Sequence, residues 1–468
     1  MTVTANHVFL DFWNSSNFMK NLAISLIFLL LPLISNADTA TQRLQEYIRI
    51  DTINPPGNES LGVAYLGGLL EEAGISYETA ESAPGRGNIW ARLEGGDEPA
   101  LILLHHIDVV PANAEFWDHP PLSGEIHDGF IYGRGAIDTK GLGIAQLQAF
   151  IALKESGKTL NRDVIYMATA DEEAGGLFGA GWLIENRPEI FEDVGFLINE
   201  GGSGMLAREH PAFSIEVTQK VPLWLRLTAT DVPGHGSSPR VTSSVKRIVR
   251  AGHRIATTEF EKQVLPEVAN YFAALARFQE GPRKQMLEDI EAAIQNKSFM
   301  MTLQLEEPWR AALLSNTCSL TTLLGSEKIN VVPPQAVLEL DCRLLPGQDP
   351  DEFVDDLRTI INDDQIEITK LLGFTAAVSD TDTPLYGAIQ QSVELTFENA
   401  VLIPSVAAGF TDSHFFRDLD ILSYGFAPFL FMPGERTGVH GNNERISVEN
   451  LERGVKVLTD LLFVFATD

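Results

Sequence analysis

The sequence predicts an α/β protein in which a mostly parallel sheet carries helices on both faces, with an inserted second domain of ferredoxin-like α+β fold. Three observations lead to this prediction. Apolar runs typical of buried strands alternate with helical segments before residue 213. A β-α-β-β-α-β order follows, which describes a compact second unit. The αβ pattern then resumes, so we expect a main domain at residues 38–212 and 376–468 and an inserted domain at 213–375.

Length and charge restrict the class of protein. A chain of 468 residues exceeds what a single hydrophobic core usually organises, so two domains are expected. The 34 Lys and Arg residues against 64 Asp and Glu residues give a net charge of -30. This balance argues against nucleic acid or an anionic membrane surface as a partner, because both repel an acidic protein.

We assign residues 1–37 to a signal peptide region. A lysine precedes an apolar run at residues 22–34, and a small-x-small motif ends at Ala37. We expect cleavage after Ala37 and a secreted or periplasmic protein without stable membrane insertion, because the run is short for a membrane-spanning helix. An uncleaved membrane anchor is the alternative. The residues before Met19 contain no Lys or Arg, which suggests that translation starts at Met19.

The elements of the main domain follow from apolar periodicity and from glycines that stop helices. In chain order we expect helices at residues 39–50 and 60–73, strands at 88–93 and 101–110, a helix at 142–156 closed by Gly157, a strand at 163–169, a helix at 179–185, a strand at 196–198, and a final helix at 448–465 capped by Ser447.

The inserted domain is expected to be richer in strands. We expect strands at residues 213–218 and 223–230, a helix at 241–256, a helical insertion at 260–310, two strands that carry the cysteines, a helix at 351–361 and a strand at 366–371. Cys318 and Cys342 lie symmetrically about Asn330 in β-like runs. If these runs pair as a hairpin, the thiols could face each other and oxidise in an exported protein; the alternative is two free thiols.

Polar residues lie at the carboxyl ends of the predicted strands, which is where open α/β sheets usually bind ligands and carry catalytic residues. His106 and Asp108 come at the end of an apolar strand, and their spacing puts both on one face, where the carboxylate can orient the imidazole toward a metal. Asp138 lies among small residues directly before a helix. Glu172 and Glu173 follow the strand at 163–169, so one could bind a metal while the other takes a proton from water.

Two further side chains complete the pattern. Glu200 follows the strand at 196–198, and His440 lies in a glycine-rich loop before the last helix. Two imidazoles and three carboxylates without a thiolate suit Zn²⁺, and a shared carboxylate suits a pair of ions about 3.5 Å apart. The remaining histidines are expected to have no ligand role; they include His105, His119, His127, His210 and His253.

Five motifs in this order carry a resemblance to a known family: HHIDVVP, GRGAIDTKG, ADEEAGG, INEGG and VHGNNE. They resemble the co-catalytic zinc peptidases that include aminoacylase, glutamate carboxypeptidase, acetylornithine deacetylase and carboxypeptidase S. The similarity extends over the chain after the signal peptide. It implies two zinc ions, for which Co²⁺ or Mn²⁺ could substitute, and an inserted lid domain that often mediates dimerisation. The insertion at 260–310 resembles the carboxypeptidase S branch and its relatives that act on N-fatty-acyl amino acids.

The resemblance also implies a role for each matching residue. Asp138 would bridge the metals, with a cis peptide bond to Thr139, and Glu172 would be the general base. His106 and Glu200 would complete one metal site, and His440 and Glu173 would complete the second. Asp108 would orient His106, and the lid residue His235 would polarise the scissile carbonyl. The implied substrate contacts are Asn330, Arg343, His414 and Arg417.

The predicted function is hydrolysis of an amide bond next to a C-terminal amino acid. Both a carboxypeptidase and an N-acyl-amino-acid hydrolase fit, because the chemistry at the carbonyl carbon is the same. The expected partners are a small peptide or N-acyl amino acid and a second copy of the chain through the lid. The alternatives are a non-catalytic binding module, which would have lost ligands, and an aminopeptidase, which would need an acidic pocket where Arg343 stands.

Overall fold

The computed structural model describes residue 1 and residues 36–468, except 208–209, 375–376, 433 and 436–437. By its contacts the chain divides into two units, Met1–Thr39 and Ala40–Asp468, and the second is described below. The apolar run of the expected signal peptide lies outside the described residues, so cleavage and export stay predictions. Among the helices that are described, none combines the length and apolar character needed to cross a membrane.

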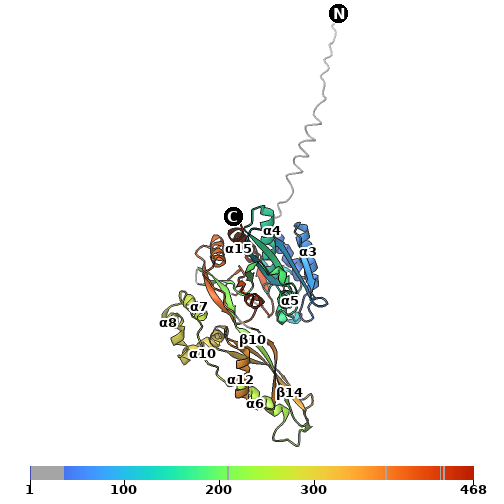
Figure 1. Cartoon of the computed structure of the whole chain (residues 1–468), viewed down its shortest axis with the longest axis vertical. Helices are drawn as coiled ribbons and strands as arrows, with labels where there is room; N and C mark the ends of the chain where they lie inside the picture. Colours follow the sequence, from blue (N-terminus) through green and yellow to red (C-terminus); the bar gives the residue numbers. More distant parts are fainter. Residues whose placement is uncertain (2–35, 208–209, 375–376, 433, 436–437) are drawn as a thin grey trace. The chain divides into compact units, whose positions relative to one another are not determined.

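A ten-stranded sheet forms the main layer of the larger unit (Figure 1). Across the sheet the strands are β1 (Glu78–Glu81), β2 (Gly87–Leu93), β6 (Arg162–Thr169), β3 (Glu98–His106), β7 (Val194–Asn199), β17 (Leu422–Gly425), β9 (His210–Gln219), β8 (Gly204–Ala207) and β18 (Leu430–Phe431), and β16 (Val401–Ala407) pairs with β9. The strands β6, β3, β7 and β17 run parallel. The predicted α/β fold with a large, mostly parallel sheet is confirmed.

Strand β3 shows why its sequence is continuously apolar. Leu101 and Leu103 belong to one buried cluster, and Ile102 and Leu104 belong to another, because successive side chains point to opposite faces. Helices cover both faces. The first cluster includes residues of α2 (Asn36–Ile48), α3 (Glu59–Glu72), α4 (Lys140–Ser156), α13 (Pro384–Thr396) and α15 (Val448–Ala466), and the second includes residues of α5 (Ala180–Asn186) and α14 (Ser413–Arg417).

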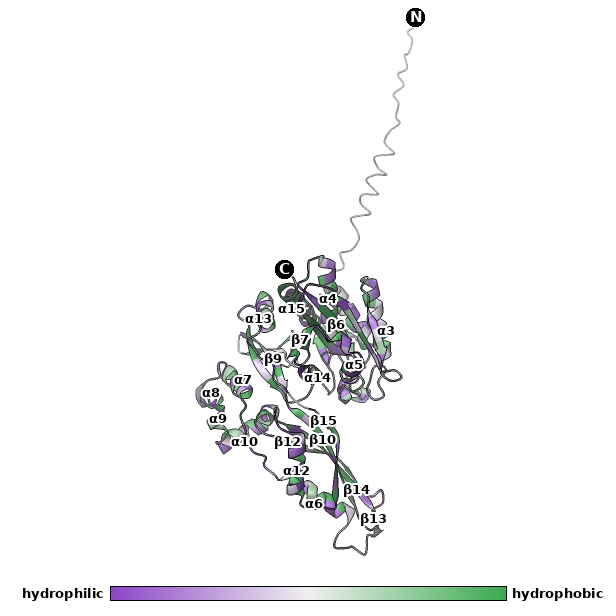
Figure 2. Cartoon of the chain, viewed as in Figure 1, coloured by the Kyte–Doolittle hydropathy of each residue, from purple (hydrophilic) through white to green (hydrophobic). Residues whose placement is uncertain are grey.

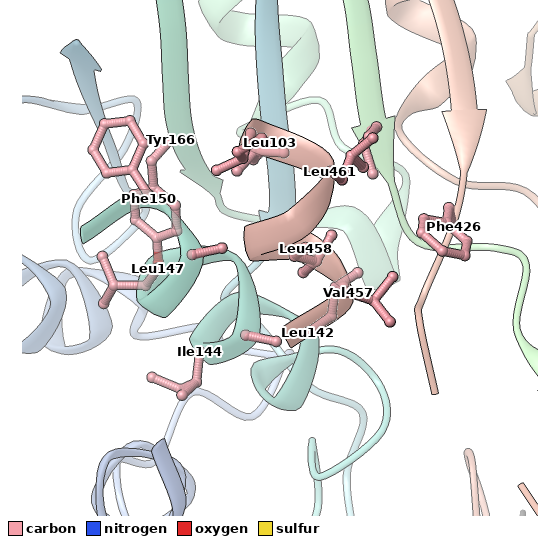
Figure 3. Packing of buried hydrophobic residues seen from close by; sticks show 14 of the residues in the cluster. Leu103, Leu142, Ile144, Leu147, Phe150, Tyr166, Phe426, Val457, Leu458 and Leu461 are labelled. Atoms are coloured by element: carbon pink, nitrogen blue, oxygen red, sulfur yellow. The ribbon is translucent and has the colours of Figure 1, made fainter. Parts of the chain in front are cut away.

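Helices α4 and α15 pack on the face of the sheet to which Leu101 and Leu103 point. Figure 3 shows α4 and α15 close to the sheet, with Leu147, Leu458 and Leu461 among the packed side chains. The ends of these helices follow sequence signals: α4 stops at Gly157, which is left-handed with φ 63°, and the side chain of Ser447 accepts the backbone N–H of Asn450 at the start of α15. Figure 2 shows hydrophobic residues along α15, and the buried ones include Leu451, Leu458 and Leu461.

A second, antiparallel sheet follows β9 along the chain. Its strands, in sheet order, are β12 (Thr317–Leu324), β14 (Gln335–Leu344), β10 (Val221–Thr230) and β15 (Ile366–Gly373). Alternate residues of β10 are buried against two helices, α6 (Ser244–Ala256) and α12 (Pro350–Ile361). The predicted domain boundary at residue 213 falls inside β9, which pairs within the ten-stranded sheet. The change from one sheet to the other therefore comes at Lys220.

Cys318 and Cys342 face each other across β12 and β14 and form a disulfide. Their Cα atoms lie 4.0 Å apart. Of the two alternatives that the sequence left open, the structure shows the oxidised pair.

The helical insertion has its own apolar cluster. Its helices are α7 (Pro266–Ala276), α8 (Gly281–Glu288), α9 (Ile290–Ala293), α10 (Lys297–Glu306) and α11 (Pro308–Ala311). Phe272 and Leu303 are fully buried in this cluster, together with Ile403 and Val406 of β16. The insertion therefore packs on the edge of the ten-stranded sheet.

Candidate metal centre

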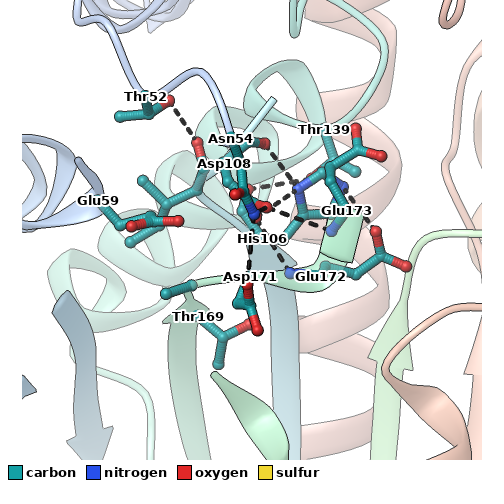
Figure 4. A network of polar contacts seen from close by, with 12 residues as sticks. Thr52, Asn54, Glu59, His106, Asp108, Thr139, Thr169, Asp171, Glu172 and Glu173 are labelled. Carbon is teal, nitrogen blue, oxygen red and sulfur yellow. Dashed lines mark hydrogen bonds and ion pairs between the residues drawn. The ribbon is translucent and has the colours of Figure 1, made fainter. Parts of the chain in front are cut away.

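The ends of neighbouring strands position the polar side chains that the sequence singled out. His106 is the last residue of β3, Glu172 and Glu173 follow β6, and Glu200 follows β7. Because β3 pairs in parallel with both β6 and β7, these strand ends lie at one edge of the sheet. Asp138 comes just before α4, joined to Thr139 by the expected cis peptide bond. Figure 4 shows His106, Glu172 and Glu173 converging.

The structure arranges the five expected ligands as two groups of three that share Asp138. In one group, His106 Nε2 lies 3.1 Å from Asp138 Oδ1 and 3.5 Å from Glu200 Oε1. In the other, His440 Nε2 lies 3.1 Å from Asp138 Oδ2 and 3.0 Å from Glu173 Oε2. Each carboxylate oxygen of Asp138 thus faces a different imidazole.

The ring of His106 is held from its Nδ1 side. This nitrogen lies 2.8 Å from the backbone carbonyl oxygen of Asp108 and 3.5 Å from that residue's Oδ1. A carbonyl oxygen only accepts hydrogen bonds, so Nδ1 carries the hydrogen and Nε2 is directed at Asp138 and Glu200. The sequence predicted that the carboxylate of Asp108 orients the ring, whereas the shorter contact comes from its carbonyl group.

The buried carboxylate of Asp108 mainly holds the turn that follows β6. Its Oδ1 accepts the backbone N–H of Glu172, and its Oδ2 accepts the backbone N–H of Glu173, both at 3.2 Å. Oδ2 also accepts the side-chain amide of Asn54 at 2.8 Å. Asp108 therefore fixes the two glutamates relative to His106.

Behind this turn lies a buried network that the sequence did not single out. Arg86 Nη2 lies 2.6 Å from Asp171 Oδ1 and 2.9 Å from Glu59 Oε1. Asn54 links it to Asp108, and its amide also lies 3.3 Å from Asp171 Oδ1. Burial, followed by the charge of Asp108, raises the pKa of Glu59 to about 7. Arg86 lies in a loop without a motif, so only the fold reveals its role.

Glu444 holds the turn that presents Asp138. Its fully buried carboxylate accepts the backbone N–H groups of Ile137 at 2.8 Å and Asp138 at 3.0 Å. It also pairs with Arg134 Nη1 at 2.6 Å, and Arg134 donates to the carbonyl oxygens of Gly438 and Gly441 on either side of His440. The turn that carries Asp138 and the loop that carries His440 are thereby joined.

The electrostatics of the groups reflect an excess of carboxylates. Burial, and then the charge of Glu200, raises the pKa of Glu172 well above its ordinary value. Burial, and then the charge of Asp138, does the same to the pKa of Glu200. Hydrogen bonds to Asp138 and Glu173 raise the pKa of His440 to about 10. The directions of these pKa shifts show that the cluster favours added positive charge, which bound cations would supply.

The residues present fit divalent cations. Each group offers one imidazole nitrogen and two carboxylates, a donor set that suits Zn²⁺, and lacks a thiolate. In addition, Glu173 Oε1 is buried without a hydrogen-bond partner among the described residues. Such an atom is costly unless a cation or another donor reaches it.

Two expected lid residues, the catalytic candidate His235 and the substrate-binding candidate Asn330, contact each other's segments. His235 lies in β11 (Gly234–His235), which pairs with β13 (Val331–Val332), and its Nδ1 lies 2.8 Å from Ser237 Oγ. The carbonyl oxygen of Asn330 accepts the N–H of Gly236. Both His235 and Asn330 are exposed, and among the described residues no hydrogen bond or ion pair joins either of them to Asp138.

Arg343 lies against Phe410 in the loop before α14, and His414 lies within α14 itself. The guanidinium of Arg343 pairs with Asp341 at 2.7 Å and lies 5.1 Å from the ring centroid of Phe410. The ring of His414 stacks on Phe374 with centroids 3.9 Å apart, and neither ring nitrogen has a partner among the described residues.

Arg417, the remaining expected substrate contact, is buried and already engaged. It pairs with Glu216 at 2.8 Å and donates to Ser379 Oγ and the carbonyl oxygen of Ser423. These partners belong to the sheet and to the segment beside it. The structure thus gives Arg417 a role in holding the sheet together and does not show it facing the groups that share Asp138.

The lining of a cavity of about 420 Å³ includes Gly201, the residue after Glu200. One wall consists of β16 residues that include Ile403 and Val406. The helical insertion supplies the opposite wall with Tyr271, Leu275 and Trp309. The sheet and the insertion thus enclose this cavity together, and most of the side chains that line it are apolar.

Comparisons with known proteins agree with this geometry. The family model described as Peptidase family M20/M25/M40 matches residues 102–463. The N-fatty-acyl-amino acid synthase/hydrolase PM20D1 of Xenopus tropicalis is 31% identical over 400 residues, which cover 81% of this chain and 75% of that protein. Aminoacylase-1 of Sus scrofa is 29% identical over 436 residues, with 90% and 94% covered. An M20 family metallo-carboxypeptidase structure from Sulfolobus solfataricus shares the fold, with a TM-score of 0.74, 19% identity, and 91% and 99% covered.

Proposed function

The chain belongs to peptidase family M20/M25/M40 and is a hydrolase, and from this premise we propose that it cleaves the amide bond next to a C-terminal amino acid with the help of two zinc ions. The observation that carries the proposal is the position of Asp138 between two imidazoles, each completed by its own glutamate.

In this proposal His106, Asp138 and Glu200 hold one ion, and Asp138, Glu173 and His440 hold the other. Bound zinc would lower the pKa of water and polarise the substrate carbonyl. Co²⁺ or Mn²⁺ could substitute, because the same donors suit them.

Glu172 is the proposed general base. It is buried, its Oε2 lies 3.9 Å from His106 Nε2, and its backbone is held by Asp108. Its neighbour Glu173 is turned toward His440 instead. Glu172 takes a proton from the attacking water and returns it to the leaving amine, for which a carboxylate with a raised pKa is suited.

The cavity whose lining includes Gly201 supports an N-acyl amino acid as the substrate rather than a polar peptide. Tyr271, Leu275 and Trp309 offer an apolar chain a place to leave water, and each buried methylene contributes about 0.8 kcal/mol. The printed name of the Xenopus tropicalis relative, an N-fatty-acyl-amino acid synthase/hydrolase, agrees with this choice.

We assign the substrate's free carboxylate to Arg343. Its guanidinium pairs with Asp341 through Nε and Nη2, while Nη1 is buried without a partner among the described residues. His235 and Asn330 would join the substrate when the lid closes, or from the partner subunit of a dimer. His235 would then stabilise the negative charge that develops on the carbonyl oxygen.

Two alternatives fit less well. A non-catalytic binding module would have no need for a buried base beside a complete set of ligands, and Glu172, Asp138 and His440 are all in place. An aminopeptidase would need acidic side chains around the substrate's amine, whereas the described residues that line the cavity at Gly201 include no acidic side chain.

We also propose that the protein works outside the cytoplasm. The Cys318–Cys342 disulfide supports a secreted or periplasmic location, because such bonds persist in oxidising compartments.

The test is a comparison of three substrates: an N-long-chain-acyl amino acid, an N-acetyl amino acid and a dipeptide. The purified protein should hydrolyse the long-chain substrate with the highest kcat/KM, lose activity after chelation, and regain it with Zn²⁺, Co²⁺ or Mn²⁺. Full activity in metal-free protein would refute the metal-dependent mechanism, and a preference for the dipeptide would refute the assignment of the cavity.

A further inference from the structure

We propose that His119, Glu125 and His127 form an additional cation site, separate from the groups that share Asp138, for a borderline divalent metal such as Zn²⁺, Cu²⁺ or Ni²⁺. One donor atom from each of the three side chains lies within 4.8 Å of the others. Two imidazole nitrogens and one carboxylate form a donor set that these metals prefer.

The local sequence holds two of the donors on a tight hairpin. Strand β4 (Ile126–His127) pairs with β5 (Phe130–Tyr132), and the two-residue turn consists of Asp128 and Gly129, with φ of 50° and 81°. Such a turn favours an Asp-Gly pair, because both residues are left-handed. Glu125 and His127 are two residues apart in an extended segment, so they share a face.

The third donor comes from the preceding loop. His119 is followed by Pro120 and Pro121, whose rings restrict the backbone there. Its ring stacks on that of His127 with centroids 3.5 Å apart and an angle of 8° between the planes. The loop and the hairpin are therefore in contact through the two imidazoles. One ring must turn out of the stack for both nitrogens to bind one cation, because an imidazole binds a metal in its ring plane.

Both imidazoles face the same carboxylate oxygen. His127 Nε2 lies 2.9 Å and His119 Nδ1 lies 3.9 Å from Glu125 Oε2. Among the described residues, these three side chains have polar partners only within their own cluster. The cluster is partly exposed, so a cation can enter from solvent and water can complete its coordination.

A cation at this site would restrain the loop that supports His440. Asp118, next to His119, accepts the side-chain amide of Asn443 at 2.9 Å, and its N–H donates to Asn443 Oδ1 at 2.8 Å. Trp117 lies 5.3 Å from the guanidinium of Arg134, which holds the carbonyl oxygens of Gly438 and Gly441. The site therefore stabilises the loop around His440 from outside.

Cu²⁺ and Zn²⁺ stoichiometry tests the proposal. The His119→Ala/His127→Ala double variant should bind one equivalent less of either metal than the unaltered protein after dialysis. In electron paramagnetic resonance spectra of the Cu²⁺-loaded proteins, the unaltered protein should give a signal with coupling to two imidazole nitrogens. The double variant should lack this signal. His253→Ala is the matched control, because His253 is an exposed histidine outside both clusters, and it should retain the full stoichiometry.

The comparison is independent of the proposed function. In a His440→Ala variant, which disrupts a group at Asp138, the signal assigned to His119 and His127 should persist. Equal stoichiometry in the unaltered protein and the double variant would overturn the proposal and leave a histidine pair bonded to Glu125 only. Should the double variant fail to fold, Glu125→Gln provides the same comparison.

Discussion

Glu172 and Glu173 are adjacent in sequence, but their surroundings assign them different tasks. Glu173 contacts His440 at 3.0 Å, whereas Glu172 lies near His106 and Glu200. We predict that Glu172→Gln keeps the bound metal and lowers kcat by a factor of about 10² to 10⁴, because the amide cannot take a proton. Metal analysis and steady-state kinetics of the same preparation would check this.

The matched control for that variant is Glu173→Gln. This variant replaces a proposed metal-ligating carboxylate with an amide of almost the same shape. It should therefore lower the metal content as well as the rate. A Glu172→Gln protein that loses metal to the same extent would contradict the division of roles between the two glutamates.

His414 makes stability depend on pH. Burial, and then the charge of Arg417, lowers its pKa to about 3, below the value of 6.5 that applies to an exposed histidine. As the pH falls from 6.5 toward 3, the unfolded chain binds a proton that the folded protein does not, so the free energy of unfolding decreases. Over this range the decrease is on the order of 4 kcal/mol, and above pH 6.5 the contribution is absent.

We therefore predict that His414→Leu removes this part of the acid sensitivity. The free energy of unfolding of the variant, relative to the unaltered protein, should rise as the pH is lowered from 7 to 4 in urea titrations. His253→Gln controls for the loss of an exposed histidine. Parallel curves for the variant and the unaltered protein would show that His414 does not contribute.

At the scale of elements, two helical glycines make a matched pair. A Cβ atom at Gly454 of α15 would lie 2.5 Å from Phe429 Cε1, whereas a Cβ atom at Gly387 of α13 would meet nothing within 4 Å. Gly387→Ala should stabilise the protein by about 0.5–1 kcal/mol, because alanine favours helix. Gly454→Ala should destabilise it by about 1–3 kcal/mol through overpacking. Thermal unfolding of both variants checks the pair, and equal shifts would refute it.

Elements were predictable where the signal is local. The apolar run that ends at His106, the glycine that closes α4 and the serine that caps α15 each specify their element within a short window. The pairing of β9 was not predictable, because its neighbours β8, β16 and β17 lie on both sides of it in sequence. Its alternating residues fit either sheet.

The candidate site shows the same limit. The five residues in the two groups end a strand, follow one or precede a helix, so their order along the chain indicated a common edge of the sheet. Arg86, Asn54 and Asp171 contact one another across many residues, from 32 to 117 positions apart. No short pattern encodes such contacts, and the same holds for His119 beside the hairpin that carries His127.

At the scale of the whole molecule, the exposed position of His235 predicts that the site is completed by movement or by a second copy. Glu172→Gln and His235→Ala subunits are each expected to be nearly inactive, because one lacks the base and the other the donor to the carbonyl oxygen. Mixed after subunit exchange, they should regain activity if His235 acts in the partner's site, since a mixed dimer contains one intact site.

Sedimentation would establish whether dimers form, and a tagged subunit would report exchange. Recovery of activity supports action between subunits. Exchange without recovery would show that His235 acts on its own chain through lid closure, and a monomer would exclude the dimer.

The hydrogen bonds from Ile137 and Asp138 to Glu444 join parts of the chain that are 307 and 306 positions apart. A ribosome therefore makes Asp138, Glu172 and Glu200 long before it makes His440 and Glu444. Until the later segment arrives, the turn at Asp138 has no carboxylate to bind its N–H groups, and the second imidazole does not exist. If both groups are needed for hydrolysis as proposed above, we expect an unfinished chain to be inactive toward the amide bonds around it.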